Sequence, residues 1–261
     1  MVKGKEQNMM NPHTQNLNRL EFVITYACTG RCKHCSEGDH LGCSEYLDGD
    51  AAAQVVYKAA KAYNIKSLMT FGGEPLLRPE AVCRLHSAAQ EMHIPKRQLI
   101  TNGFFSKDVV KIRDVAMCLA KSGVNDILLS VDAFHQETIP LEPVKMFAAA
   151  VKAEGIPLRT QPAWLVSTDA ENPYNRKTRE ILKEFERMGI AANDGNVIFP
   201  SGNARKYLKE YFDLSQEPVS PYAEDPRDIH TICVEPDGAV LGANIHEADI
   251  LDILDRYVPE K

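Results

Sequence analysis

Short apolar segments alternate with longer amphipathic segments along most of the chain. The short ones are bounded by Gly, Pro, Asn or Asp, which is typical of buried strands, and the longer ones repeat apolar residues at helical spacing. Strands are predicted at residues 21–26, 67–71, 98–101, 126–131, 158–164 and 196–199. Helices are predicted at residues 51–63, 79–92, 107–121, 141–153, 175–188 and 205–211.

This alternation predicts an α/β fold built from right-handed βαβ units around a parallel sheet. Six units are fewer than the eight of a complete barrel, so we expect a partial (β/α)6 TIM-like barrel. No G-x-G-x-x-G sequence follows the first strand, which argues against a dinucleotide-binding fold. Parallel α/β folds bind ligands at the carboxyl ends of their strands, and we expect the functional site at that edge.

The end of the chain has a different pattern. A surface linker, two strands joined by a Pro-Asp-Gly turn and a helix are predicted, in that order, at residues 213–227, 231–234, 239–241 and 247–255. We therefore divide the chain into a barrel, residues 1–212, and a C-terminal extension, residues 213–261. The hairpin and helix of this extension are expected to form a short cap that closes one end of the barrel.

The composition excludes several classes of protein. Among 261 residues, 44% are hydrophobic and the formal net charge is −6, so the chain is not of the disordered class. This mild acidity argues against nucleic acid and anionic membranes as partners. No apolar run is long enough to span a bilayer, and residues 1–18 lack the apolar stretch of a signal peptide, so a cytoplasmic location is expected. The 7 cysteines should then be reduced.

Three of these cysteines are closely spaced directly after the first predicted strand. Cys28, Cys32 and Cys35 follow the pattern C-x-x-x-C-x-x-C, and such thiolates suit zinc or an iron–sulfur cluster. Structural zinc usually pairs one C-x-x-C with a second ligand pair, and no second C-x-x-C occurs in the chain. Three cysteines without an obvious fourth suit a [4Fe–4S] cluster with one open iron. Candidates for a fourth ligand are Cys43, His34 and His40.

The cysteine spacing resembles the motif of the radical S-adenosylmethionine (radical SAM) superfamily. The resemblance implies that Cys28, Cys32 and Cys35 hold a [4Fe–4S] cluster whose open iron binds S-adenosylmethionine. It further implies that an external one-electron reductant of the flavodoxin or ferredoxin type reduces the cluster. A 5′-deoxyadenosyl radical is then formed and abstracts hydrogen from the substrate. His34 stands where family members often carry an aromatic residue near the adenine.

Two glycines and a glutamate close the second predicted strand and support the resemblance. Gly72, Gly73 and Glu74 match the G-G-E-P motif, which implies that Glu74 accepts a hydrogen bond from the methionyl ammonium group. Glycine lets the backbone approach a ligand closely. An ordinary tight turn is the alternative, because Gly and Pro punctuate turns.

Further polar residues end the next three strands. The resemblance implies that Thr101, in a T-N-G turn, and Ser130 lie near the carboxylate and ribose of the cofactor. Arg159 and Gln161 share one face of the fifth strand, so both are candidates for carboxylate contacts if that face points inward. The alternatives are an ordinary turn for the T-N-G sequence, a strand-end cap for Ser130 and a surface ion pair for Arg159.

Three residues are candidates for catalysis. Asp132 and His135 lie at the mouth of the fourth strand, where a histidine that titrates near neutral pH can move a proton. Cys233 stands in a segment that resembles the C-terminal extension of peptide-modifying family members. One thiol cannot hold an auxiliary cluster, so none is expected. Some peptide epimerases of the family use one cysteine to return a hydrogen atom, and Cys233 is a candidate for this role. A capping-loop histidine and a buried strand cysteine are the alternatives.

The remaining questions concern the substrate and the runner-up function. Residues 1–20 are too few for a separate leader-binding domain, so we expect a peptide bound at the barrel mouth or a small metabolite. The alternative function is a zinc-stabilised α/β protein that binds a ligand without radical chemistry. A third possibility is a pseudo-enzyme that keeps the cluster but does not turn over a substrate.

Two further cysteines have a structural interpretation. Cys83 and Cys118 lie in predicted helices and are expected to be small buried core residues.

Overall fold

The fold was analysed in a computed structural model, which describes residues 10–39, 42–215 and 220–259. Its strands are β1 (Arg19–Val23), β2 (Ser67–Phe71), β3 (Lys96–Thr101), β4 (Asp126–Ser130), β5 (Leu158–Gln161), β6 (Ala163–Trp164), β7 (Asn196–Val197), β8 (Thr231–Val234), β9 (Ala239–Val240) and β10 (Ala243–Asn244). Its α-helices are α1 (Gly49–Ala62), α2 (Pro79–Glu91), α3 (Val109–Lys121), α4 (Ala133–Gln136), α5 (Leu141–Ala153), α6 (Pro173–Arg187), α7 (Gly202–Tyr207) and α8 (Ile250–Arg256). Short 3-10 turns span Pro75–Leu77 and Lys209–Tyr211.

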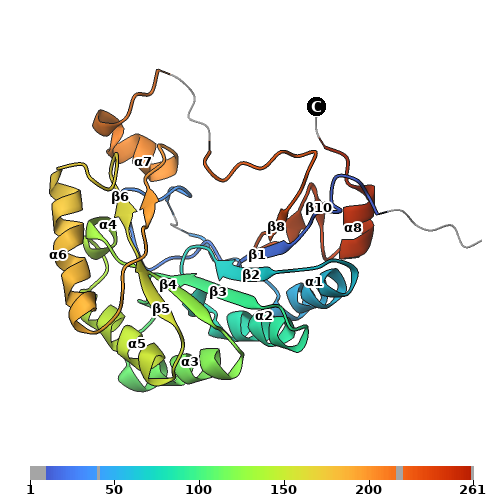
Figure 1. The fold of residues 1–261 in the computed structure, drawn as a ribbon, viewed down its shortest axis with the longest axis horizontal. Coiled ribbons are helices and arrows are strands. Elements are labelled where there is room, and N and C mark those ends of the chain that lie inside the picture. The colour runs from blue at the N-terminus through green and yellow to red at the C-terminus, as the bar shows by residue number, and fades with distance from the viewer. Residues whose placement is uncertain (1–9, 40–41, 216–219, 260–261) are drawn as a thin grey trace, which may run out of the picture.

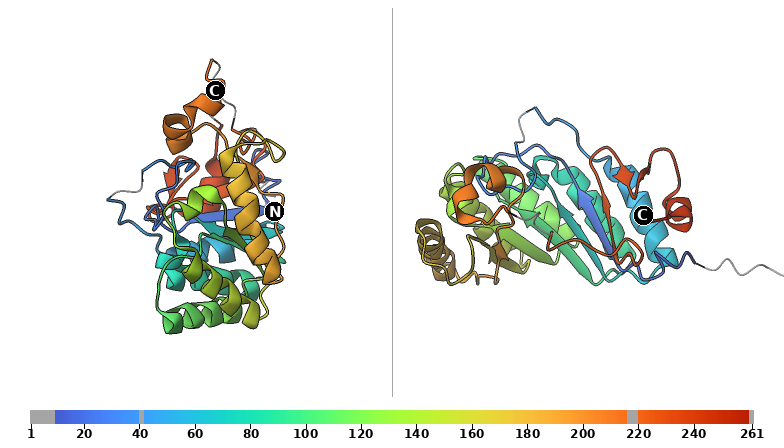
Figure 2. Two further views of the ribbon diagram at one scale, coloured as in Figure 1. Left: turned by 90° about the vertical axis from the view of Figure 1, so that its left-hand side faces the viewer. Right: turned by 90° about the horizontal axis from the view of Figure 1, so that it is seen from above.

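Six parallel strands form one curved sheet in the order β5-β4-β3-β2-β1-β8. Helices α1, α2, α3 and α5 cover its convex face, and the concave face opens upward in Figure 1. Strands β5 and β8 are the two edges, so the barrel is open between them, as the view from above in Figure 2 also shows. The predicted α/β partial barrel is confirmed.

The sixth strand of this sheet is not the one that the sequence predicted. The segment at 196–199 forms only the short β7, which pairs with β6 in a separate two-stranded sheet. The position beside β1 is filled by β8, from the C-terminal segment, with Glu21 opposite Cys233. The apolar pattern predicted both strands, but parallel pairing depends on contacts far apart in sequence, which the pattern does not contain.

The C-terminal hairpin also differs from the prediction. Residues 231–234 and 239–241 were expected to pair with each other, but β9 pairs antiparallel with β10. Helix α8 packs on α1 at the edge of the sheet. The division at residue 212 stays a prediction, although the extension donates a strand to the barrel sheet.

Two further expectations concern cysteines and membrane spans. Cys83 is buried on α2 as expected, but Cys118 is exposed on α3, so the expectation of a buried core residue is wrong there. None of the described helices has the length and apolar character needed to cross a membrane.

The centre of the fold is an apolar layer between the sheet and its outer helices. The largest fully buried side chains include Phe22 of β1, Leu68 of β2 and Leu99 of β3, which face this layer. The alternate residues of the same strands face the concave side. This alternation fixes the register of each strand, because a shift by one residue would turn apolar side chains toward the open face.

Replacement of Phe22 by Ala is expected to lower the free energy of unfolding by about 3–5 kcal/mol, because it leaves a cavity in this layer. Urea denaturation followed by circular dichroism measures the change as a lower midpoint at constant slope. Val258→Ala is the matched control, since Val258 is 78% exposed and its loss should change stability by less than about 0.5 kcal/mol. Equal effects of the two substitutions would contradict the proposed core.

Candidate functional site

A cavity of about 570 Å³ lies at the carboxyl ends of the strands of the main sheet. Apart from Glu74, Arg159 and Cys43, the described residues predicted to act at the site line it. They are Cys28, Cys32, His34, Cys35, Gly72, Gly73, Thr101, Ser130, Asp132, His135, Gln161 and Cys233. Glu74 lies behind the cavity wall. The topology therefore brings residues from nearly the whole sequence to one place.

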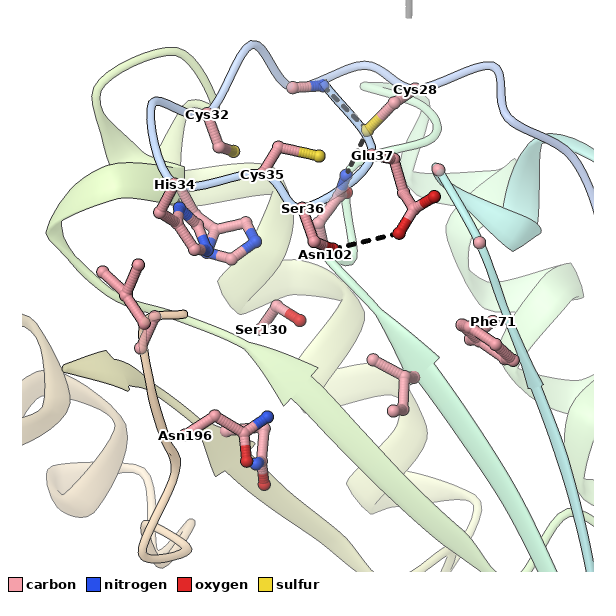
Figure 3. Close-up of a pocket in the computed structure, with 18 of the residues that line it drawn as sticks. Cys28, Cys32, His34, Cys35, Ser36, Glu37, Phe71, Asn102, Ser130 and Asn196 are labelled. Carbon is pink, nitrogen blue, oxygen red and sulfur yellow. Dashed lines mark hydrogen bonds between the residues drawn. The ribbon is translucent and has the colours of Figure 1, made fainter. Parts of the chain in front are cut away.

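The three motif cysteines lie on the loop that follows β1 and arches over the strand ends (Figure 3). Cys32 is buried, and Cys28 and Cys35 are half-buried. The Sγ of Cys28 accepts hydrogen bonds from the backbone of Gly30 at 3.3 Å and from Asn102 Nδ2 at 3.6 Å. Burial raises the pKa of Cys28 to about 11 and also raises the pKa of Cys32 and Cys35.

The start of this loop is fixed by the glycine turn after β2. The backbone amides of Gly73 and Glu74 donate to the carbonyl oxygens of Thr25 and Ala27 at 2.7 and 2.8 Å. A Cβ on Gly73 would lie 2.3 Å from the Ala27 oxygen, so no larger residue fits. Gly72 has a φ of +135°, which favours glycine. The glycines therefore hold the cysteine loop as well as lining the cavity.

Glu74 joins the ends of β2 and β3. Its fully buried carboxylate accepts hydrogen bonds from Leu76 N at 2.9 Å, Thr101 Oγ1 at 2.7 Å and Asn102 N at 2.8 Å. Burial raises the pKa of Glu74 to about 7, although the three donors act in the opposite direction. With its oxygens turned to these donors, Glu74 positions the Thr101 turn, and its direct contact with a cofactor stays a prediction.

The far end of the cysteine loop is held by α7, a contact that the sequence did not reveal. The backbone amide of Asn203 donates to the Cys35 oxygen at 2.8 Å, and its side-chain amide donates to the Cys32 oxygen at 3.2 Å. A Cβ on Gly202 would lie 2.3 Å from the Ser36 oxygen. The only available signal was the Ser-Gly-Asn sequence, which reads as an ordinary helix start.

Asp132, which is buried, and His135, which is half-buried, form a hydrogen-bonded pair beside the cysteine loop. Asp132 Oδ1 caps α4 through the amides of Phe134 and His135, and Oδ2 accepts from His135 Nδ1 at 2.8 Å and from Ala163 N at 3.0 Å. Burial opposes ionisation of Asp132, but the charge and hydrogen bonds of His135 outweigh it and hold its pKa well below the usual range. Asp132 therefore orients the His135 ring.

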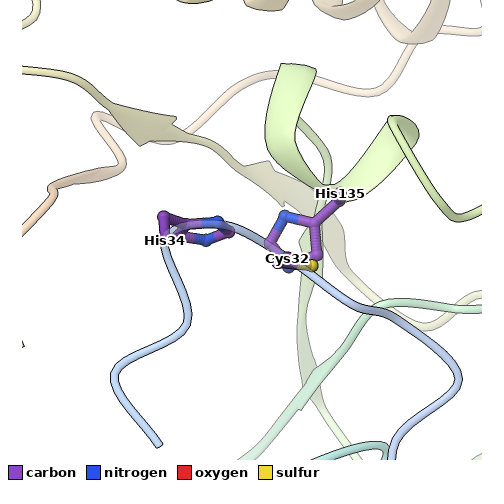
Figure 4. A group of neighbouring side chains, drawn as sticks. All are labelled: Cys32, His34 and His135. Atoms are coloured by element: carbon purple, nitrogen blue, oxygen red, sulfur yellow. The ribbon is translucent and has the colours of Figure 1, made fainter. Parts of the chain in front are cut away.

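The structure also allows a comparison of the two metal hypotheses. Cys32, His34 and His135 are neighbours (Figure 4), and each places one ligand atom within 4.8 Å of the others. The Nδ1 of His34 is buried and has no hydrogen-bond partner among the described residues. Loss of hydration lowers the pKa of His34 to about 4, so it is a neutral ligand at neutral pH. This trio suits a single zinc ion.

The three thiols of one loop suit a cluster equally well, because iron–sulfur clusters are held by cysteine thiolates. All three line the same cavity, so a cluster held there would face the strand ends. Both sites use Cys32 and cannot be filled together. His40 lies outside the described residues, and Cys43 is exposed and does not line the cavity. Geometry alone therefore leaves zinc and cluster open.

The opposite wall of the cavity is formed by β4 and β5. Ser130 and Gln161 are register partners on these strands and both line the cavity. Gln161 Oε1 accepts from Asn193 Nδ2 at 2.6 Å, which fixes the amide. Arg159 does not line the cavity; it forms an ion pair with Asp126 at 2.8 Å. Of the two candidates on β5, Gln161 alone reaches the cavity.

The wall near β8 carries an acidic cluster that the sequence analysis missed. Glu235 accepts a hydrogen bond from the hydroxyl of Tyr26, and both residues line the cavity with Cys233 and Glu37. In the sequence, the one indication was that Glu235 lies two residues after Cys233, which places both side chains on the same side of an extended chain. Burial and then the neighbouring carboxylates raise the pKa of Cys233 to about 12. Cys233 is therefore a protonated thiol at neutral pH.

Comparison with protein families gives one matching model, described as the radical SAM superfamily, over residues 22–157. These residues run from the end of β1 to the residue before β5 and include the cysteine loop, the glycine turn and the strands β2 to β4. This match favours the cluster over zinc as the metal at the cysteine loop.

Two curated relatives match different shares of the chain. A protein of Saccharolobus islandicus named probable GTP 3′,8-cyclase is 26% identical over 225 residues, which is 83% of this chain and 68% of the relative. A GTP 3′,8-cyclase of Desulforamulus reducens is 29% identical over 133 residues, which is 50% of this chain and 39% of the relative.

Two solved structures share the fold. Streptococcus suis SuiB, bound to S-adenosylmethionine, has a TM-score of 0.59 and 15% identity, with 92% of this chain and 66% of SuiB covered. The enzyme anSMEcpe with bound AdoMet has a TM-score of 0.56 and 15% identity, with 91% of this chain and 77% of that chain covered. At this identity, the likeness concerns the fold.

The buried Glu74 predicts a dependence of stability on pH. Its pKa is raised from 4.5 to about 7, so folding favours the protonated form. The free energy of unfolding is expected to fall as pH rises from 4.5 to 7, by up to about 3 kcal/mol, and to stay level above. Glu74→Gln should remove this slope. Urea denaturation of both proteins without ligands, at a series of pH values, measures the free energy of unfolding. If it depended on pH equally in the two proteins, the raised pKa of Glu74 would be contradicted.

Proposed function

Because this chain belongs to the radical SAM superfamily, we propose that Cys28, Cys32 and Cys35 ligate its [4Fe–4S] cluster and that the cavity binds cofactor and substrate together. The family's cluster and S-adenosylmethionine supply a 5′-deoxyadenosyl radical that abstracts hydrogen from a substrate. The observation that supports this assignment most directly is that all three thiols line the cavity at the strand ends. The chain is a radical SAM enzyme.

The wall from β2 to β5 is proposed to bind S-adenosylmethionine. The backbone at Gly72 and Gly73 approaches the cavity without side chains, and Thr101, Ser130 and Gln161 offer polar groups along the strand ends. His34 packs against Phe134, with ring centroids 5.0 Å apart, and is proposed to lie beside the adenine. Glu74 is proposed to support this wall from behind, since its oxygens already accept three hydrogen bonds.

The charge of the cavity supports a substrate without phosphate groups. Among the described residues that line it, Glu37, Asp132 and Glu235 are acidic and none is Lys or Arg. A triphosphate such as GTP, which the curated relatives' names mention, is usually held by Arg, Lys or a metal ion. A peptide or a small amine-bearing metabolite suits an acidic wall better. SuiB, which shares the fold, has also been solved with its precursor peptide SuiA.

Cys233 is proposed to return a hydrogen atom to the substrate radical. This role requires an intact S–H bond, and its raised pKa keeps Cys233 protonated. Transfer of the hydrogen atom breaks the S–H bond, forms a C–H bond and leaves a thiyl radical on Cys233. One electron from an external flavodoxin- or ferredoxin-type reductant and one proton then restore the thiol. The proposed reaction is epimerisation of a peptide residue, which leaves the product with the mass of the substrate.

His135 is proposed to move a proton during the reaction. Asp132 holds Nδ1 of its ring at 2.8 Å, so the second ring nitrogen is free to face the cavity, which His135 lines. Asp132 itself contacts the protein through its cap and its bond to Ala163 N, and is therefore a positioning residue.

Replacement of Cys32 by Ala is expected to abolish cluster assembly and formation of 5′-deoxyadenosine, because one of three ligands is lost. Anaerobic reconstitution, iron analysis and dithionite reduction with S-adenosylmethionine measure this, with about four irons per chain expected in the wild type. Cys43→Ala is the matched control and should behave as wild type, since Cys43 is exposed and lies outside the cavity. A colourless wild-type protein with one zinc per chain would support the zinc alternative instead.

Replacement of Cys233 by Ala should leave 5′-deoxyadenosine formation intact but abolish the product, because the radical is formed and not quenched correctly. With a candidate peptide in deuterated buffer, the wild type should incorporate one deuterium at the modified carbon. Normal product and normal deuterium content in the variant would rule out Cys233 as the donor. GTP tested in parallel should not stimulate cofactor cleavage.

A further inference from the structure

Two cysteines meet on the convex face of the barrel, on the opposite side of the sheet from the cavity. Cys83 lies on α2 and Cys118 on α3, and these helices pack against each other. The sulfur atoms are 2.7 Å apart. Cys83 is 8% exposed, whereas Cys118 is exposed to solvent. Neither residue lines the cavity, so the pair is separate from the cluster chemistry.

The separation of the two sulfur atoms is unusually short for side chains that merely pack. Non-bonded heavy atoms settle at roughly 3.5–4.0 Å, and a disulfide bond is about 2.05 Å long. Formation of the bond therefore needs the two sulfur atoms to approach by about 0.7 Å. The two thiols already point toward each other, because the contact is a direct one between their sulfur atoms.

We propose that Cys83 and Cys118 form a redox-active dithiol that small disulfides oxidise to a disulfide bridge between α2 and α3. Exposure makes Cys118 the thiol that an oxidant meets first. Burial, and then the neighbouring Cys118, raise the pKa of Cys83 to about 12, so Cys83 acts second, once its partner has been activated.

The exchange is balanced with a low-molecular-weight disulfide as oxidant. The Cys118 thiolate attacks one sulfur of the oxidant, forms a mixed disulfide and releases one small thiol. Cys83 then loses its proton and attacks the Cys118 sulfur, which forms the protein disulfide and releases the second small thiol. Two protein thiols are oxidised and one small disulfide is reduced to two thiols.

The bridge would join the two βα units that carry the cofactor loops. Helix α2 follows the Gly72–Glu74 turn, and α3 follows the turn at Thr101 and Asn102. Hydrogen bonds from Thr101 and Asn102 to Glu74 already join these two turns. A covalent link across residues 83–118 also restricts the unfolded chain. Oxidation should therefore stabilise this half of the barrel without altering the cavity.

The test uses the anaerobically reconstituted protein incubated with oxidised glutathione, alkylated and digested with trypsin. We expect a cross-linked peptide that joins residues 114–121 to residues 67–84, since Arg78 precedes proline and is not cleaved. We also expect the melting temperature to rise by roughly 5–10 °C, reversed by a thiol reductant. Cys118→Ser should lose both effects, and Cys83→Ser should stop at a glutathione adduct on Cys118.

Cys43→Ser is the control, because it removes an exposed thiol from a different surface and should leave the cross-link intact. The proposal is overturned if Cys118 in the wild type accumulates as a glutathione adduct or stays free at oxidant levels that modify Cys43. Both readouts are independent of cofactor cleavage, so their failure would leave the radical SAM assignment untouched.

Discussion

The architecture of the site depends on one contact, the close approach of the glycine turn to the chain that enters the cysteine loop. The amides of Gly73 and Glu74 donate to the oxygens of Thr25 and Ala27, and only glycine fits at this distance. The buried carboxylate of Glu74 then carries the constraint to Thr101 and Asn102. Three strand ends are thereby locked together, and the cysteine loop is held where its three thiols line the cavity.

Much of this arrangement follows from the sequence. The apolar runs predict β1 to β5, and the parallel topology then brings their carboxyl ends to one edge. Cys28, Ser130 and Gln161 could be placed at the cavity for this reason, although they are distant in the chain. Parallel βαβ units are local in sequence, and local patterns are the ones that hydrophobic periodicity describes well.

Other features are decided by contacts that no local pattern contains. The sixth strand of the sheet is β8, which pairs with β1, and not the expected segment at 196–199, because edge pairing depends on contacts far apart in the sequence. Glu74 turns away from the cavity because three donors surround it, and Asn203 reaches the cysteine loop from 168 residues away along the chain, counted from Cys35. Arg159 is neutralised by Asp126 of the neighbouring strand. In each case, contacts with segments distant in the sequence decide where the strand or side chain lies, and residue type alone does not reveal them.

The central claim is that Cys28, Cys32 and Cys35 hold a cluster with an open iron that binds S-adenosylmethionine in the cavity below. Electron paramagnetic resonance of the anaerobically reconstituted, dithionite-reduced protein, recorded with and without S-adenosylmethionine, tests it most directly. We expect the signal of a reduced [4Fe–4S] cluster whose shape changes when S-adenosylmethionine is added. The absence of a cluster signal, or a signal that S-adenosylmethionine leaves unchanged at saturating concentration, would rule out such a cluster.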